Sequence, residues 1–415
     1  MKYFKLHIFI KFVEGDRGGC LYDMHAKKMF QLTEECASKL RDAEKGKPVD
    51  EHDFFLQSLC QKCMGAFYDS CAYVESMRVG AAKPYEEIVK MKPQLNQLYI
   101  QVTNDCDGDC CFCEIGNTVS TKTRCKKWNN PDAWFTPEIW NQILCDARAL
   151  HCSTVSFIGG NPLLAFDRIK MITQVARESG ISNFEIYTNL NTITPEQISF
   201  LAENNFGVVV QLFDVHEDVL GTAISGKTVL HNIKQLLHCK IDIKVDLLIT
   251  SLNDEDIENI FSNLKRIYSG RISVSYFYNN TGTVYASTKY INDMFKRQYY
   301  PVSKESLTFL EKYHGCLYGK AYINLSGTVT PCPMMNNYVL GRLQEETLVE
   351  ILSKDAYSDV IHLSPSSLDG CADCELRANC VDCRALEFSA THKIDGVHFC
   401  ERLLSKSREN VGNGF

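Results

Sequence analysis

The chain has 415 residues, of which 45 % are hydrophobic, and its 51 acidic and 44 basic side chains give a formal net charge of −7. This composition excludes a disordered or fibrous protein, and the length is enough for two to four domains with their own cores. The mild acidity argues against a nucleic-acid-binding surface. No apolar run approaches the ~18 residues of a membrane span, so we expect neither nucleic acid nor membrane as a partner.

The 20 cysteines need a separate explanation. Lys11 ends the only apolar run near the N-terminus, which is shorter than the ~7-residue core of a secretory signal peptide. We therefore expect a cytoplasmic protein. In a reducing compartment, clustered cysteines are more often metal ligands or catalytic groups than disulfides.

The first 90 residues predict a small α+β domain. Residues 3–13 and 20–31 are aromatic and β-branched runs separated by GDRGG, which is the pattern of a hairpin. Thr33 offers a helix N-cap before two acidic residues, and apolar residues recur at helical spacing over residues 53–68. The polar stretch 83–93, which contains two prolines, is interpreted as a linker.

From residue 96 onward, strand and helix patterns alternate. Six β/α units predict a parallel sheet or an open barrel with helices outside and the active site at the C-terminal ends of the strands. The strand patterns cover residues 97–103, 154–158, 183–188, 207–213, 241–249 and 271–278. The helix patterns cover residues 136–150, 167–179, 194–204, 230–238 and 254–268. The last hundred residues show too little periodicity for a hydrophobic core, so we expect a segment held together by metal.

The first predicted strand is followed by NDCDGDCCFCE, which places Cys106, Cys110 and Cys113 in a CxxxCxxC spacing. Three thiolates on one tight loop can hold three irons of a cubane and leave the fourth iron open for another ligand. Spacing alone also allows a zinc loop whose fourth ligand lies elsewhere in the chain.

The second predicted strand ends at Gly159, Gly160, Asn161 and Pro162. Two glycines at this place let the backbone approach a ligand closely, so that its amides and carbonyls can bind a charged amino-acid moiety. Such a turn by itself is a weak signal. Beside the cysteine loop of the neighbouring strand it becomes a strong one.

Together these motifs resemble the radical S-adenosylmethionine (SAM) enzymes over about residues 95–280. The resemblance implies that the three cysteines hold a [4Fe-4S] cluster whose open iron chelates the amino and carboxylate groups of SAM. It further implies that the turn 159–162 binds the SAM amino group, that Phe112 lies near the adenine and that Asn189 points toward SAM. In such enzymes reductive cleavage of SAM gives a 5'-deoxyadenosyl radical, which abstracts an unactivated hydrogen.

Two features depart from the family pattern. Asn161 stands where the family usually has Glu, so a charged contact to the SAM ammonium becomes at best a neutral hydrogen bond. No clear Arg follows Asp214 to clamp the SAM carboxylate, and Lys227 is the candidate that we can name for that role.

Seven cysteines follow in the C-terminal part of the chain: Cys316, Cys332, Cys371, Cys374, Cys380, Cys383 and Cys400. Their CxxCxxxxxCxxC run resembles the SPASM domain, which carries auxiliary [4Fe-4S] clusters in radical SAM enzymes that modify peptides. The resemblance assigns an outer cluster to Cys371, Cys374, Cys380 and Cys400, and an inner one to Cys316, Cys332 and Cys383. The inner cluster is one thiolate short, so its fourth iron takes another ligand, for which His314 is a candidate, or stays open. A zinc ribbon is the alternative for this segment.

We therefore expect a partial (β/α)6 TIM-like barrel over residues 91–300. A winged-helix-like α+β domain over residues 1–90 and a cysteine-rich SPASM domain over residues 301–415 flank it. The N-terminal domain resembles the precursor-peptide recognition domain of maturases that act on ribosomally synthesised peptides, in which the leader adds a strand to a sheet edge. A purely structural cap is the alternative.

The expected enzyme installs a crosslink in such a precursor, with a thioether from a peptide cysteine as the first choice. The expected cofactors are SAM and three [4Fe-4S] clusters, with an electron donor such as flavodoxin or ferredoxin. Carbon–carbon or carbon–oxygen crosslinking and formylglycine-type sulfatase maturation are the enzymatic alternatives. A non-catalytic iron–sulfur or zinc scaffold is the alternative from another class.

Overall fold

The computed structural model describes residues 2–71, 74, 94–108, 110, 113, 118–120, 126–213, 224–249, 257–279, 298–398 and 400. The chain forms two compact units. Unit 1 comprises Met1–Met91, Arg297–Gly315 and Ile361–Asp382, and unit 2 comprises Lys92–Lys296, Cys316–Val360 and Cys383–Phe415.

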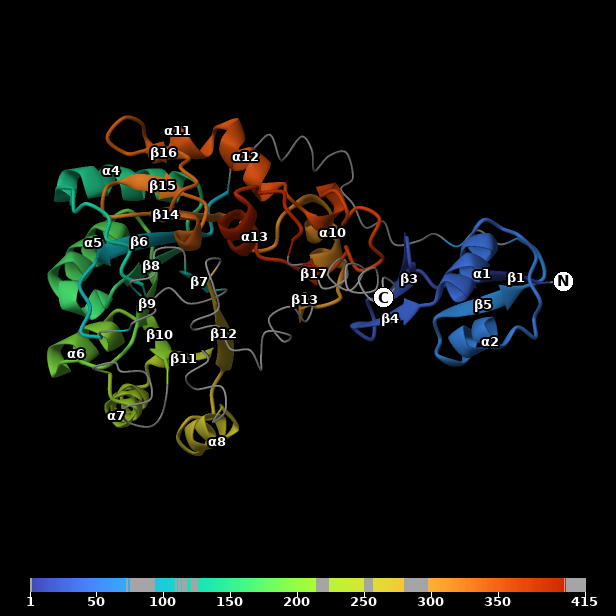
Figure 1. Cartoon of the computed structure of the whole chain (residues 1–415), viewed down its shortest axis with the longest axis horizontal. Helices are drawn as coiled ribbons and strands as arrows, with labels where there is room; N and C mark the ends of the chain where they lie inside the picture. The colour runs from blue at the N-terminus through green and yellow to red at the C-terminus, as the bar shows by residue number, and fades with distance from the viewer. Residues whose placement is uncertain are drawn as a thin grey trace, which may run out of the picture. The chain divides into compact units, whose positions relative to one another are not determined.

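Unit 2 is built on a ten-stranded sheet in the order β16-β15-β14-β6-β8-β9-β10-β11-β12-β7 (Figure 1). The six predicted strands are present, parallel and adjacent, and each end lies within one residue of the prediction. They are β6 (Gln97–Thr103), β8 (Thr154–Gly159), β9 (Asn183–Thr188), β10 (Phe206–Leu212), β11 (Asp242–Ile249) and β12 (Ile272–Asn279). This sheet confirms the expected partial (β/α)6 architecture.

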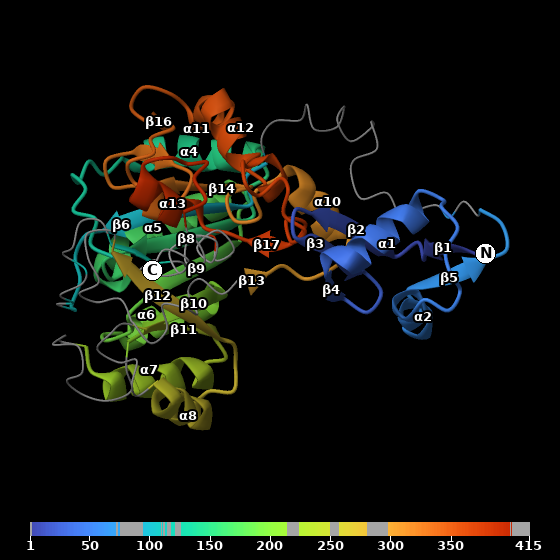
Figure 2. The same ribbon diagram turned by 45° about the vertical axis from the view of Figure 1, so that its right-hand side comes forward.

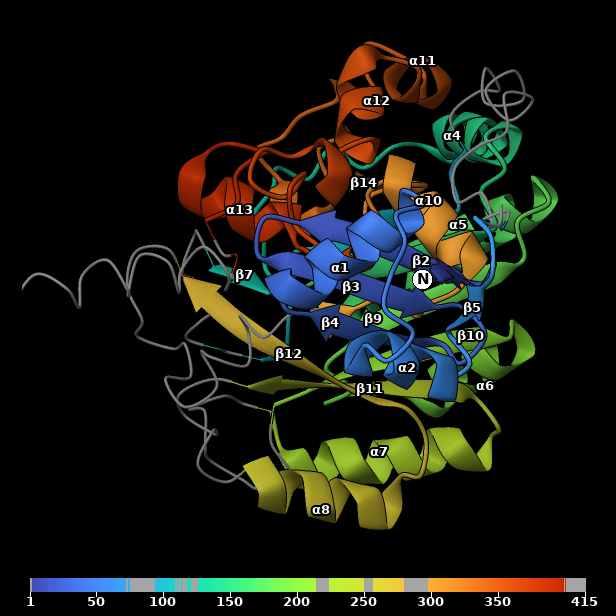
Figure 3. The same cartoon turned by 90° about the vertical axis from the view of Figure 1, so that its right-hand side faces the viewer.

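Two helices of the β/α units begin at residues whose side chains cap them, Thr194 and Ser225. The Thr194 hydroxyl accepts a hydrogen bond from the Gln197 backbone, and the Gln197 side chain accepts one from the Thr194 backbone, which forms a capping box. Figure 3 shows two of the helices, α7 and α8, side by side along β11 and β12. The helices are α4 (Pro137–Ala149), α5 (Phe166–Glu178), α6 (Pro195–Glu203), α7 (Gly226–His238) and α8 (Ile257–Ile267), and a 3-10 turn, η1 (Pro162–Ala165), precedes α5.

The two faces of the parallel sheet differ in chemistry. On the helix side, Phe206 stacks on Phe184 with ring centroids 5.2 Å apart and meets Phe200 of α6 at 5.8 Å. The opposite face carries buried polar side chains, among them Gln211, whose Nε2 donates to Asp246 Oδ2 at 3.1 Å. Successive side chains of a strand point to opposite faces of the sheet, so the polar side chains of neighbouring strands share the face opposite the helices.

The C-terminal hundred residues do contain a hydrophobic core, so that expectation was wrong. Tyr322 and Ile323 are fully buried on β14 (Lys320–Ile323), which pairs in parallel with β6. This pairing joins segments more than 200 residues apart, which local periodicity does not reveal. The other elements of unit 2 are β7 (Thr118–Ser120), β15 (Thr328–Thr330), β16 (Gly341–Arg342), η3 (Pro333–Met335), α11 (Leu348–Leu352) and α13 (Arg384–Thr391), with α12 (Asp355–Ile361) ending at the unit boundary.

Unit 1 contains the predicted hairpin, but each predicted run splits into two strands. The strands form a three-stranded antiparallel sheet, β2-β3-β4, and a separate pair, β1-β5, and α1 packs on the larger sheet (Figure 2). The elements are β1 (Tyr3–Leu6), β2 (Ile10–Gly15), β3 (Gly18–Asp23), β4 (Lys28–Leu32), α1 (Glu34–Glu44), α2 (Phe54–Gln61), β5 (Gly65–Tyr68), β13 (Gln298–Tyr299), α10 (Lys304–Lys312), η4 (Pro365–Ser367) and β17 (Cys380–Val381).

The helix expected over residues 53–68 ends at Gln61. Cys63 has a positive φ of 55°, which terminates the helix, and Gly65 then begins β5, which pairs with β1. Pairing with β1 therefore overrides the helical spacing of the apolar residues.

Both faces of the β2-β3-β4 sheet are covered. Leu21 packs with Leu40 of α1 in one core, whereas Cys20 and Tyr22 pack on the other face in a core that includes Cys374. The Tyr22 hydroxyl donates to the Glu375 carbonyl at 2.9 Å. The N-terminal sheet and the segment with three of the C-terminal cysteines thus form one folded unit.

Candidate active site

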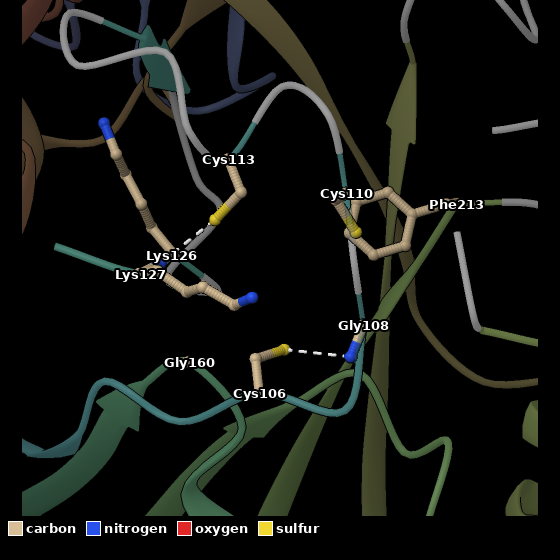
Figure 4. Close-up of a pocket in the computed structure, with 8 residues that line it drawn as sticks. All are labelled: Cys106, Gly108, Cys110, Cys113, Lys126, Lys127, Gly160 and Phe213. Carbon is tan, nitrogen blue, oxygen red and sulfur yellow. Dashed lines mark hydrogen bonds between the residues drawn. The ribbon is translucent and has the colours of Figure 1, made fainter. Parts of the chain in front are cut away.

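The three cysteines of the CxxxCxxC motif line one pocket at the C-terminal ends of the parallel strands. Cys106, Cys110 and Cys113 follow β6, and their sulfur atoms surround the open space at the centre of Figure 4. Residues from the ends of other strands and from the cluster loop complete the lining: Gly108, Lys126, Lys127, Gly160 and Phe213. The structure therefore joins the cysteine loop to the glycine turn, as predicted.

Gly159 and Gly160 let the turn after β8 lie directly against the cysteine loop. Gly159 has a φ of +144°, which L side chains rarely adopt, and a Cβ on Gly160 would overlap the carbonyl oxygen of Asp105. The Asn161 backbone amide donates to the same carbonyl at 2.7 Å. The glycines are required for this close approach of two loops.

Backbone amides point at two of the three sulfur atoms. The amide of Gly108 donates to Cys106 Sγ at 3.4 Å, and that of Lys127 donates to Cys113 Sγ at 3.0 Å. Burial raises the pKa of the Cys113 thiol, so a metal that holds the thiolate would have to outweigh this cost. N–H···S hydrogen bonds of this kind tune iron–sulfur centres.

The three cysteine sulfurs of the pocket are a donor set that suits an iron–sulfur cluster. In a cubane each thiolate binds a different iron, so the three sulfur atoms surround the group instead of meeting at a point. The residues present therefore suit a [4Fe-4S] cluster with one iron left without a cysteine.

Asn161 and Asn189 converge on Asp107, a carboxylate within the cysteine loop. Asp107 Oδ1 accepts from Asn161 Nδ2 at 2.9 Å and from Asn189 Nδ2 at 2.8 Å, and Oδ2 accepts from the Thr192 hydroxyl. Half-burial alone would raise the pKa of Asp107, but these hydrogen bonds lower it below its usual value. The ionised carboxylate thus ties together the loops that follow β6, β8 and β9.

Lys126 is a second charged residue of the site. It lines the cysteine pocket, and burial lowers the pKa of its amine. Its backbone amide donates to the Gly159 carbonyl at 3.1 Å.

Lys227, the candidate named for the SAM carboxylate, is exposed in the first turn of α7 and is not among the residues that line this pocket. Phe112 lies outside the described residues.

Comparison with protein families decides the identity of this site. The radical SAM superfamily matches residues 100–264, and the SPASM iron–sulfur cluster-binding domain matches residues 316–375. The chain therefore contains a radical SAM domain. It is a radical SAM enzyme with a SPASM domain, and its cysteine pocket lies within the matched core.

Solved structures share the fold at low identity. Streptococcus suis SuiB bound to precursor peptide SuiA is 17 % identical, with a TM-score of 0.56 over 97 % of this chain and 100 % of that one. AnSMEcpe with bound AdoMet and Kp18Cys peptide is 16 % identical, with a TM-score of 0.56 over 78 % of this chain and 100 % of that one. A comparison with curated proteins finds no match.

The SPASM-type cysteines fall into two groups by unit. Cys371, Cys374 and Cys380 lie in unit 1, and the other four, Cys316, Cys332, Cys383 and Cys400, lie in unit 2. Cys332 and Cys383 pack in one apolar cluster with Leu317, next to Cys316 in the chain. All seven are free of disulfides.

His314, the candidate for a non-cysteine ligand, is fully buried in unit 1. Its Nε2 lies 2.8 Å from Asp382 Oδ1. Separately, no helix among the described residues is both long and apolar enough to cross a membrane.

Proposed function

We propose that this radical SAM enzyme installs a crosslink, with a cysteine thioether as the first choice, in a ribosomally synthesised precursor peptide. The supporting observation is the extent of the likeness to SuiB, which was solved with a precursor peptide and matches 97 % of the chain. That coverage takes in the N-terminal sheet, whereas the match to anSMEcpe covers 78 %. The likeness to a peptide-bound enzyme therefore includes the N-terminal domain as well as the catalytic core. This extent favours a peptide as the substrate.

In this proposal Cys106, Cys110 and Cys113 hold the radical SAM cluster. SAM binds beside it through Phe112, the turn of Gly159, Gly160, Asn161 and Pro162, and Asn189. When reduced and bound, cluster and SAM together supply a 5'-deoxyadenosyl radical. The chain itself positions the peptide hydrogen and keeps water out of the polar interior of the sheet.

The crosslink would remove two hydrogens from the precursor. One leaves the acceptor carbon as a hydrogen atom, which becomes part of 5'-deoxyadenosine. The other leaves the cysteine thiol as a proton when sulfur bonds to that carbon, and one electron passes to the SPASM domain. Two auxiliary [4Fe-4S] clusters, held by the seven C-terminal cysteines, would give three clusters in total. A flavodoxin or ferredoxin would reduce the radical SAM cluster.

The leader of the precursor would bind the edge strand β4. Both faces of the β2-β3-β4 sheet are covered, and β2, the other edge, contacts the C-terminal segment through the Glu14 carbonyl, which accepts from Arg377 at 2.8 Å. On β4, Lys28 and Gln31 are exposed. An added peptide strand would satisfy the outward backbone groups of such an edge.

Mass spectrometry of a co-expressed precursor tests the proposal. We expect a loss of two hydrogens per link and thiols that resist alkylation. Free thiols after the same mass loss would favour carbon–carbon or carbon–oxygen crosslinks, and conversion of a lone Cys or Ser to an aldehyde would favour the formylglycine alternative.

A cysteine variant tests the site. Cys106→Ala/Cys110→Ala/Cys113→Ala should abolish reductive SAM cleavage, whereas replacing the exposed Cys145 by Ala should leave it intact. Persistent 5'-deoxyadenosine formation in the triple variant would contradict the assignment of these ligands.

A further inference from the structure

Asn161 cannot offer a hydrogen-bond acceptor to a cation. Its side chain is fully buried, and its Oδ1 already accepts from the Thr188 hydroxyl at 2.8 Å and from the Leu163 amide at 3.4 Å. Its Nδ2 is a donor and points at Asp107. A neutral amide with its oxygen engaged therefore leaves the ammonium of SAM without a partner at this side chain.

A carboxylate that can supply this negative charge is hydrogen-bonded to Asn161. Asp107 Oδ1 is 2.9 Å from Asn161 Nδ2, and its carboxylate belongs to the loop that carries Cys106. We propose that Asp107 supplies the negative charge that binds the SAM ammonium, in place of a carboxylate at position 161. The inference rests on the proposed binding of SAM at the turn 159–162.

Asp107 can attract the ammonium by its charge although its oxygens are engaged. Oδ1 accepts from Asn161 and Asn189, Oδ2 accepts from Thr192, and the residue's own backbone amide is a further donor to the carboxylate. The side chain is half-buried, so a ligand can reach it.

The same donors make the carboxylate rigid before SAM binds. Asn161 and Asn189 follow two different strands, β8 and β9, so the charge is fixed by the sheet and not by the cysteine loop alone. A fixed acceptor loses little entropy when it binds a cation. Asn189 Nδ2 also lies 3.6 Å from Cys106 Sγ, which places this network beside the cluster ligands.

The test measures equilibrium binding of SAM to the anaerobically reconstituted full-length enzyme. Asp107→Asn should weaken binding about tenfold or more, because a hydrogen bond to a charged group is lost. Glu203→Gln is the control, since Glu203 is an exposed carboxylate at the C-terminal end of α6, outside this loop. Iron per chain is measured for each variant, so that binding is compared at equal cluster content.

A SAM analogue with hydrogen in place of the α-amino group separates charge from loop structure. The wild type should prefer SAM to this analogue, and Asp107→Asn should lose that preference while binding the analogue as the wild type does.

Each result decides between the alternatives. Unchanged SAM binding in Asp107→Asn, or equal weakening for SAM and the analogue, would overturn the role of Asp107. If the wild type itself failed to bind SAM, the proposed function would fail instead.

Discussion

Deletion of residues 1–90 should destabilise the segment that carries Cys371, Cys374 and Cys380. That deletion removes Val13, Cys20 and Tyr22 from the core that they share with Val302, Leu307 and Leu376. The truncated protein is therefore expected to lose iron and to aggregate, whatever the role of the N-terminal domain in peptide binding.

The size of the effect follows from the burial of the side chains left behind. Val302 and Leu376 are 4 % exposed and Leu307 is 0 % exposed. Full exposure of a Val or Leu side chain costs about 1.5–3 kcal/mol, so even partial exposure of all three amounts to several kcal/mol. The hydrogen bond from Tyr22 to the Glu375 carbonyl is lost as well. Domains are stable by only about 5–15 kcal/mol, so the loss is a large fraction of the total.

Point variants of Tyr22 weaken the contact with the cysteine-bearing segment to different degrees in the full-length chain. Tyr22→Phe removes only the hydroxyl and should cost about 1 kcal/mol. Tyr22→Ala should cost about 3–5 kcal/mol, because the fully buried ring leaves a cavity. Lys28→Glu/Gln31→Glu on β4 is the control, since both side chains are exposed and the shared core stays intact.

Iron per chain and size-exclusion chromatography are the assays. The expected order of iron retention is wild type and the β4 variant first, then Tyr22→Phe, Tyr22→Ala and the deletion. A monomeric deletion protein with the iron content of the full-length enzyme would refute the reasoning. Loss of turnover in the deletion alone is no evidence for leader binding, whereas loss in the β4 variant at full iron content is.

Two further outcomes follow from local geometry. Gly160→Ala should prevent cluster loading, because the added Cβ overlaps the Asp105 carbonyl oxygen. Gly207→Ala is the control and should load normally, since its added Cβ would be 3.6 Å from the nearest atom, in Glu185. Equal iron per chain in the two variants would contradict this. Burial raises the pKa of Cys152 to about 11, so about 0.1 % is thiolate at pH 8 and alkylation should accelerate about tenfold per pH unit up to that pKa. Exposed Cys145 should react first in peptide mass spectrometry, and modification of both at one rate would show that Cys152 is not buried.

The strands and the radical SAM loop could be predicted because their signals are local. Apolar runs bounded by turns located the six parallel strands, and the sheet brought Cys106, Gly160 and Phe213 to one edge as parallel connections require. The role of Asp107 could not be predicted this way. Its partners at positions 161, 189 and 192 are 54 to 85 residues away in the sequence. The one local signal is the neutral Asn161, which indicates that another residue must supply the carboxylate for the SAM ammonium.

The sequence of β3 carries a signal for the packing of the N-terminal sheet. Alternating apolar and polar residues indicate a sheet with one free face, but Cys20, Leu21 and Tyr22 are consecutive apolar residues on the central strand. All six residues of β3 are buried, as in a strand that is covered on both sides. Residues 1–90 as a separate module would leave the second face of this strand uncovered.

This second face restricts how the N-terminal domain can bind a peptide. Leu21 packs on the helix side of β3, and Tyr22 and Cys20 pack on the side of the cysteine-bearing segment, so neither face is open to a ligand. A leader is then limited to the backbone edge of β4, one strand away from Tyr22. In strand addition, backbone pairing gives affinity and the side chains along the edge give specificity, so substitutions on β4 should change which leader binds more than whether the cluster segment stays folded.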